Sequence, residues 1–134
     1  MKNNIEIMMN DTSFKKEVIG EKLKSSFWYG YRQGFYSVQI YFNNFKGRIG
    51  IQATLEINPS EKDWFPIYLN STKPFLEFPK LGVNEGQKET ETYNFSGNFV
   101  WLRAVMDRKN FSFDITSENI SQFGSINKIL LVKI

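Results

Sequence analysis

Cysteine and histidine are both absent from the 134 residues of this chain. Without them the chain lacks the side chains that most often act as general base, thiol nucleophile or zinc ligand. No phosphate-binding P-loop and no G-x-G-x-x-G motif is present either, so the sequence gives nucleotide hydrolysis no support. We therefore expect a protein that works by binding or assembly, not an enzyme, and we expect no cofactor.

Paired carboxylates are the remaining route to acid–base catalysis, as in glycoside hydrolysis. Most of the candidates fall in predicted turns or on outward strand faces, where a solvated surface carboxylate is the simpler interpretation; they are Glu56, Glu61, Asp63, Asp107 and Asp114. Asn58, Glu61 and Asp63 share one turn and offer the oxygen ligands that calcium prefers. A charged hairpin tip accounts for the same three residues, so we expect no catalytic and no metal-binding residue.

Long hydrophobic runs are missing as well. No segment approaches the ~18 consecutive apolar residues that span a bilayer, and the first residues lack the apolar core of a signal peptide. The absence of cysteine agrees with this, because domains secreted alone often rely on disulfides. We expect a chain that is made and kept in the cytoplasm, with no membrane partner.

Positive charge is in slight excess, with 17 Lys and Arg against 14 Asp and Glu and a net charge of +3. Proteins that bind nucleic acid usually cluster such charge. Here the lysines between residues 15 and 24 are interrupted by Glu17 and Glu21, which is typical of a solvated segment. A nucleic-acid partner is therefore the least favoured of the binding classes.

Aromatic residues are abundant, at 16% of the chain, and apolar residues make up 41%. This content suits a soluble globular protein, and the length fits one domain with its own core. Flat and β-branched side chains pack well on a pleated sheet, so the composition favours strands. Beyond residue 25, apolar residues also never keep a helical spacing over three turns.

Two segments alternate apolar and polar residues, which is the pattern of a strand with one buried face. In residues 35–42, Val38, Ile40 and Phe42 share a face. In residues 48–57 the predicted inward face consists of Ile49, Ile51, Ala53, Leu55 and Ile57. The turn-forming residues between the two segments predict that they are a neighbouring antiparallel pair.

Six further strands are predicted, over residues 64–69, 74–78, 92–99, 100–107, 111–115 and 126–134. Pro66 confines the first of them to a sheet edge or to the start of a strand, and the segment 100–107 is apolar on both faces, as for a central strand. About eight strands result, spaced as in an all-β antiparallel β-sandwich or jelly roll. We assign residues 26–134 to this sandwich. Residues 1–25 are polar and weakly patterned, which predicts an N-terminal arm or an edge strand.

An aromatic cluster around two glycines lies at the start of the predicted sandwich and supplies the candidate binding residues. Its members are Trp28, Tyr29, Tyr31, Phe35 and Tyr36, with Arg32 among them. One strand face cannot bury so many rings, so they are candidates for a protein interface or a sugar-stacking platform. A corner of the core, with Trp28 inside and the tyrosines half covered, explains the cluster equally well.

Two tryptophans and two arginines fall within predicted strands. Trp64 and Trp101 have apolar neighbours, so we predict that they belong to the core. Arg48 and Arg103 lie in mid-strand, where we expect a carboxylate partner or a subunit boundary.

Three blocks of sequence carry a family resemblance. They are residues 47–55 followed by 63–67, then 97–105, and finally 124–131. The first block resembles the strand, turn and tryptophan of galactose-binding-like (discoidin-type) β-sandwiches, and the other two resemble their penultimate and final strands. Over residues 26–134 the chain is most similar to small β-sandwich virion-structural proteins of T4-like marine and cyanobacterial tailed phages. These motifs are packing patterns, so they bear on the fold more than on the function.

The resemblance implies a structural component of a tailed-phage particle, in the head decoration, neck, tail or baseplate. Its partners would be other virion proteins and copies of itself, and it would reach the virion by assembly in the bacterial cytoplasm. Residues 1–25 would then be an arm that orders against a neighbouring subunit. The alternative is a carbohydrate-binding module for a host-surface glycan, which requires an exposed, planar aromatic pair flanked by polar groups.

Overall fold

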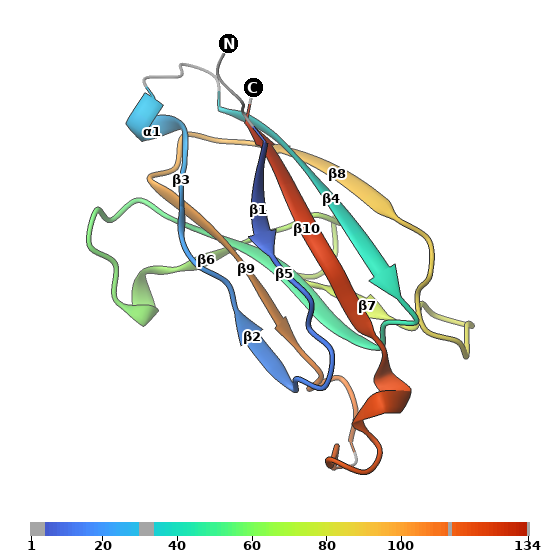
Figure 1. The fold of residues 1–134 in the computed structure, drawn as a ribbon. Helices are drawn as coiled ribbons and strands as arrows, with labels where there is room; N and C mark the ends of the chain where they lie inside the picture. The colour runs from blue at the N-terminus through green and yellow to red at the C-terminus, as the bar shows by residue number, and fades with distance from the viewer. Residues whose placement is uncertain (1–4, 30–33, 113, 134) are drawn as a thin grey trace.

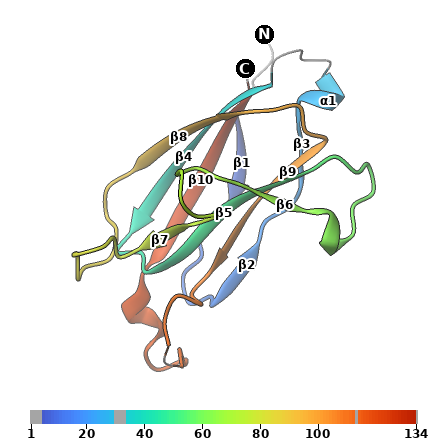
Figure 2. The ribbon, with the colours of Figure 1, turned by 180° about the vertical axis from the view of Figure 1, so that it is seen from behind.

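The fold is a β-sandwich of two antiparallel sheets, seen from opposite sides in Figures 1 and 2. This structure is a computed structural model, and it describes residues 5–29, 34–112 and 114–133. The four-stranded sheet has the order β1 (Ile5–Met9), β10 (Ser125–Lys133), β4 (Phe35–Asn43) and β8 (Glu91–Ser96). The six-stranded sheet has the order β2 (Glu17–Ile19), β9 (Trp101–Asp107), β5 (Gly47–Thr54) and β6 (Phe65–Ile67). In the same sheet, β3 (Leu23–Lys24) also pairs with β9, and β7 (Leu76–Phe78) also pairs with β5.

The predicted all-β antiparallel sandwich is confirmed, with ten strands in the described residues where we expected about eight. Helical structure in the same residues is limited to α1 (Ser26–Tyr29) and the short 3-10 turns η1 (Glu61–Asp63) and η2 (Ile120–Phe123). Within the described part of the chain, no helix has the length and apolar character needed to cross a bilayer.

The core lies between the sheets. Buried and more exposed side chains alternate along β4 and along most of β5, as the sequence predicts. Val38, Ile40 and Phe42 of β4 are buried, and they face Ile49 and Ile51 of β5 across the interior. The central strand β9 contributes Leu102, Ala104 and Met106, and β10 contributes Ile126, Ile129 and Leu131. Pro66 lies in the edge strand β6, as expected.

The predicted pairing of β4 with β5 is wrong, because the two strands belong to different sheets. The chain crosses between the layers at Asn44, which has a φ of 53°, and at Phe45, which is fully buried. The Phe45 ring packs against Phe42 and Phe78, so this crossing is part of the core. Two strands that face each other across a core alternate in the same way as two neighbours, so the pattern alone does not distinguish them.

Two other strand predictions differ from the structure. Leu55 and Ile57 were expected to face inward but are 63% and 50% exposed, because β5 ends at Thr54. Residues 111–115 were expected to be a strand, but the described residues among them form none. Instead Phe111 and Ile115 pack with the η2 residues Ile120 and Phe123 in a second, smaller apolar cluster.

Three strands between residues 5 and 24 belong to the two sheets. β1 is the edge strand beside β10, and β2 and β3 lie side by side with β9 (Figure 1). Met8 and Met9 are buried in the core, and the Thr12 hydroxyl accepts a hydrogen bond from the backbone N–H of Ile126 at 2.8 Å. This part of the expected N-terminal arm or edge strand therefore pairs with strands of its own sandwich.

Candidate functional site

Of the six predicted binding residues, the structure describes the side chains of Trp28, Phe35 and Tyr36. Tyr31 and Arg32 lie outside the described residues, as does the side chain of Tyr29. Phe35 is 46% exposed and sits opposite Ser96 at the start of β4. Trp28 is 38% exposed in α1.

Tyr36 is a core residue. Its ring is 1% exposed and stacks on Phe95, with 5.0 Å between the ring centroids. Its hydroxyl contacts the Ser25 hydroxyl, accepts a hydrogen bond from the Ser26 backbone N–H at 3.1 Å, and donates one to the Gly97 carbonyl at 3.2 Å. This residue therefore joins the segment before α1 to the segment after β8, and it is not available to a partner.

Replacing Tyr36 by phenylalanine is expected to lower the free energy of unfolding by about 1–3 kcal/mol, because buried polar groups lose their partner. Urea denaturation followed by circular dichroism measures the change. Tyr68→Phe is the matched control, since that side chain is 57% exposed, and it is expected to change stability by less than about 0.5 kcal/mol. Equal stability of Tyr36→Phe and the wild type would contradict the role given to this hydroxyl.

Trp28 lies at the centre of an aromatic group that α1 and β9 bring together. The Phe27 backbone N–H donates to the Phe99 carbonyl at 3.2 Å, which ties the single turn of α1 to the start of β9. The Trp28 ring then contacts Trp101, with 5.2 Å between centroids and 51° between planes, and Phe27, at 5.4 Å and 88°. Trp101 was expected in the core, but it is half-buried because it points to the outer face of the sheet.

Two lysines and one carbonyl hold the tryptophans in place. The Lys22 ammonium lies 4.9 Å from the centroid of Trp101, and the Lys24 ammonium lies 5.5 Å from that of Trp28. β3 sets these positions, because Lys24 pairs directly with Trp101 in the sheet. The Trp101 Nε1–H donates to the Ile57 carbonyl at 2.8 Å and so fixes the segment after β5. Cations over indole rings are attracted by the negative ring face.

We call the apolar side chains of this region the tryptophan surface. It consists of Phe27, Trp28, Leu55, Ile57 and Trp101. Phe27 is 56% exposed, and Leu55 and Ile57 are also largely exposed. Figures 1 and 2 both show α1 and the β5–β6 connection on the same side of the sandwich. Exposed apolar side chains that gather on one side of a protein often mark a binding surface.

The outer face of the six-stranded sheet carries the two mid-strand arginines, and each has the expected carboxylate partner. Arg103 is buried, lies 4.1 Å over the half-buried Trp64 ring, and donates to Glu61 at 2.9 and 3.2 Å. Arg48 donates to Asp107 at 2.7 and 2.9 Å. Planar guanidinium and carboxylate groups match in this two-bond geometry.

The three carboxylates of this region are held in their ionised form. Burial raises the pKa of Asp107, but hydrogen bonds from Arg48 and from the Lys109 backbone outweigh it and the net pKa is lowered. Hydrogen bonds from Arg103 lower the pKa of Glu61, and those from Ser60 lower the pKa of Asp63. None of the three is thus poised to act as a general acid at neutral pH. Among the described residues, no three acidic side chains gather as metal ligands would.

Comparisons of the chain with protein-family models, with curated proteins and with solved structures found no significant match.

Proposed function

We propose that this protein is a structural component of a tailed-phage particle and that it assembles with another virion protein through the tryptophan surface. The observation that carries the proposal is the contact between the exposed Trp28 and the half-buried Trp101, with the exposed Phe27, Leu55 and Ile57 on the same side of the sandwich. Tryptophan is enriched among the residues that dominate binding energy at protein interfaces, and exposed apolar neighbours exclude water around it. The phage setting is supported by the resemblance of the strand motifs to those of small virion proteins.

The chemistry of the surface specifies its partner. Lys22 and Lys24 stand over the two indole rings and bring positive charge to an apolar centre. A complementary partner presents an apolar pocket for Trp28 and carboxylates for the two ammonium groups. Sugar stacking fits this surface less well, because the ring planes are tilted by 51° and lysines occupy the ring faces.

Replacing Trp28 by alanine is expected to reduce incorporation into particles roughly 30-fold, the equivalent of a ~2 kcal/mol interface hot spot. The variant and the wild type are each expressed during assembly of the phage particles, and copies per purified particle are counted by quantitative mass spectrometry. Phe14→Ala is the matched control, because it removes an aromatic ring that is 72% exposed outside the tryptophan surface.

Wild-type copy number for Trp28→Ala, with an intact fold by circular dichroism, would reject the tryptophan surface as the docking site. Absence of the wild-type chain from purified particles would reject the virion role itself. Equal losses for Trp28→Ala and Phe14→Ala would show that incorporation depends on general surface hydrophobicity.

A further inference from the structure

The strand β8 forms one edge of the four-stranded sheet, and Figures 1 and 2 both show it on the outside of the sandwich, beyond β4. It has six residues and pairs with β4 in unbroken register, from Ser96 opposite Phe35 to Glu91 opposite Ile40. Within the described part of the chain, β8 pairs with no other strand. An edge strand of this kind presents backbone N–H and C=O groups that can pair with another chain.

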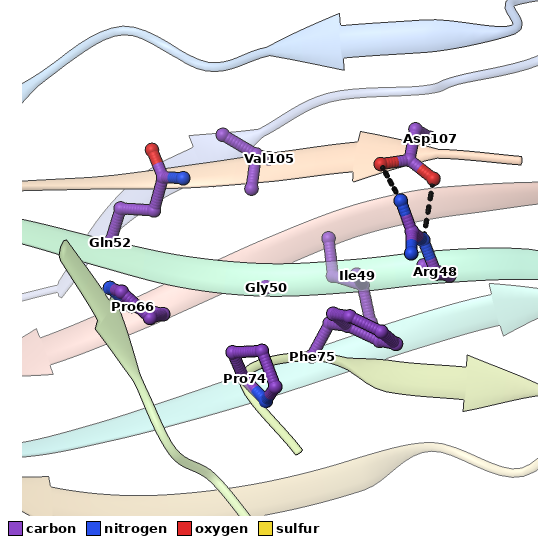
Figure 3. Close-up of a pocket in the computed structure, with 9 residues that line it drawn as sticks. All are labelled: Arg48, Ile49, Gly50, Gln52, Pro66, Pro74, Phe75, Val105 and Asp107. Carbon is purple, nitrogen blue, oxygen red and sulfur yellow. Dashed lines mark hydrogen bonds and ion pairs between the residues drawn. The ribbon is translucent and has the colours of Figure 1, made fainter. Parts of the chain in front are cut away.

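The other described sheet edges carry features that discourage such pairing. β1 has a register shift between Ile7 and Met9, and an irregularity of this kind twists an edge away from a partner. β2, β3, β6 and β7 are at most three residues long. Pro66 of β6, labelled in Figure 3, has no N–H group to donate to a further strand. β8 contains no proline, glycine or lysine, so it is the described edge best suited to pairing.

The pairing with β4 determines which backbone groups of β8 point outward. The Gly97 N–H donates to the Gly34 carbonyl at 2.9 Å, and these two residues lie opposite each other just beyond the paired ends of the two strands. Hydrogen-bonded and non-hydrogen-bonded pairs alternate along an antiparallel ladder, so every second residue of β8 points its backbone groups toward β4. The others point theirs away from the sheet, and their side chains are exposed: Thr92, Asn94 and Ser96.

A second copy of β8 complements this edge when the two strands pair antiparallel about Asn94. Asn94 then lies opposite Asn94 of the second copy and Thr92 lies opposite Ser96, so the three outward residues all match one another. Each of these pairs exchanges two backbone hydrogen bonds. On the inner side of the sheet, Tyr93 lies opposite Phe95 of the second copy, and both side chains are half-buried in the single chain. Aromatic and hydroxyl pairs across strands stabilise antiparallel sheets.

The charge on β8 is compatible with this register. Glu91 is the only charged residue of the strand, and the Lys80 ammonium contacts its carboxylate. Pairing about Asn94 places the Glu91 residues of the two copies at opposite ends of the paired segment, so they do not repel each other. The contact is a two-fold one, in which each copy uses the same edge, and the dimer therefore has no β8 edge left to recruit a third copy.

We propose that two copies of this chain join through β8, paired antiparallel about Asn94, so that their four-stranded sheets form one continuous sheet. β8 shares no residue with the tryptophan surface, so this inference does not depend on the proposed function. A pair of short strands buries little surface, and we expect a dimer Kd on the order of 100 µM.

The first test is sedimentation equilibrium of the full-length chain from about 10 µM to about 1 mM, a range that brackets this Kd. The wild type is expected to change from monomer to dimer and to form nothing larger. Asn94→Lys is expected to weaken the dimer at least about tenfold, because two lysines then face each other on the symmetry axis. Asn127→Lys is the matched control, since it makes the same substitution at an exposed position of β10, which has neighbours on both sides. It should dimerise as the wild type does.

The second test is disulfide cross-linking with diamide, which reports the register because the chain contains no cysteine. Asn94→Cys places the two thiols in directly opposite positions, with Cα atoms about 5.5 Å apart, a distance that a disulfide can bridge. In Thr92→Cys the two thiols are about 13 Å apart, since four residues of strand separate them. Asn94→Cys is therefore expected to form the covalent dimer at least about tenfold faster than Thr92→Cys. A mixture of Thr92→Cys and Ser96→Cys should form the mixed dimer as fast as Asn94→Cys.

A wild-type chain that remains monomeric at about 1 mM, tenfold the expected Kd, would overturn the proposal. Undiminished dimerisation of Asn94→Lys would do so as well, as would equal cross-linking rates for Asn94→Cys and Thr92→Cys. Trp28→Ala should dimerise normally. Loss of the dimer in Trp28→Ala, with the dimer retained in Asn94→Lys, would place the contact between copies at the tryptophan surface and not at β8.

Discussion

Replacing Arg108 by methionine is expected to lower the free energy of unfolding by roughly 3–5 kcal/mol, because it removes the hydrogen-bond donor of several backbone carbonyl groups. Arg108 is 3% exposed and donates to the carbonyls of Lys15, Lys46, Phe123 and Gly124, at 2.6 to 2.9 Å. These four carbonyls come from three separate parts of the chain, which the guanidinium joins at one end of the sandwich. Methionine retains the apolar stem but leaves the carbonyls without donors, at about 1–3 kcal/mol for each one that stays buried.

Burial lowers the pKa of Arg108 to about 10, so the guanidinium still carries its charge at neutral pH. The measurement is urea denaturation of the variant at pH 7. Lys109→Met is the control, because it removes the same charge from an exposed neighbour, and it should change stability by less than about 0.5 kcal/mol. Arg108→Lys keeps the charge but has fewer donors, and it should fall between the two. A loss below about 1 kcal/mol for Arg108→Met would mean that water replaces the guanidinium at these carbonyls.

Gly124→Ala is expected to cost at least about 4 kcal/mol and to leave little folded protein at 37 °C. Gly124 has φ 59° and ψ −156°, a region that is essentially restricted to glycine. An added Cβ would lie 2.1 Å from the Asn44 carbonyl oxygen and 2.3 Å from that of Asn43, so the backbone itself would have to move. Arg108 contacts the same crossing between the sheets, because it donates to the carbonyls of Lys46 and Gly124.

Gly82→Ala provides the control, because Gly82 has a φ of 81° and nothing lies within 4 Å of an added Cβ there. It should show only the backbone cost of a positive φ, about 1–2 kcal/mol. Thermal unfolding of both variants separates the conformational cost from the steric one. Similar melting temperatures for the two variants would show that the backbone at the crossing moves easily to accept the added Cβ. That result would contradict the close packing described there.

The sequence predicted individual strands better than their neighbours. Strict alternation identified β4 and β5, and apolar residues on both faces identified β9, because one face or both faces of a strand must be buried. The same alternation misplaced β5 beside β4, since facing strands and neighbouring strands bury the same positions. It also carried the predicted strand on to Leu55 and Ile57, although the chain leaves the sheet after Thr54.

The candidate site was predictable in part. Clustered rings identified Trp28 as a binding candidate, but the same argument included Tyr36, whose hydroxyl finds partners far along the chain, such as Gly97. The contributions of Lys22 and Lys24 depend on β3 pairing with β9, a contact between segments about 80 residues apart in sequence. Local sequence patterns carry no information about such a pairing.

The position of β9 and β10 in the chain has a consequence for synthesis. Each is a central strand of its sheet, yet they are the last two strands in chain order. β1 pairs with β10, and β2 and β3 pair with β9, so these early strands leave the ribosome long before their partners exist. Apolar strands without partners are prone to aggregate. Rapid pairing of the early strands, once β9 and β10 have been synthesised, therefore limits the time in which they can aggregate.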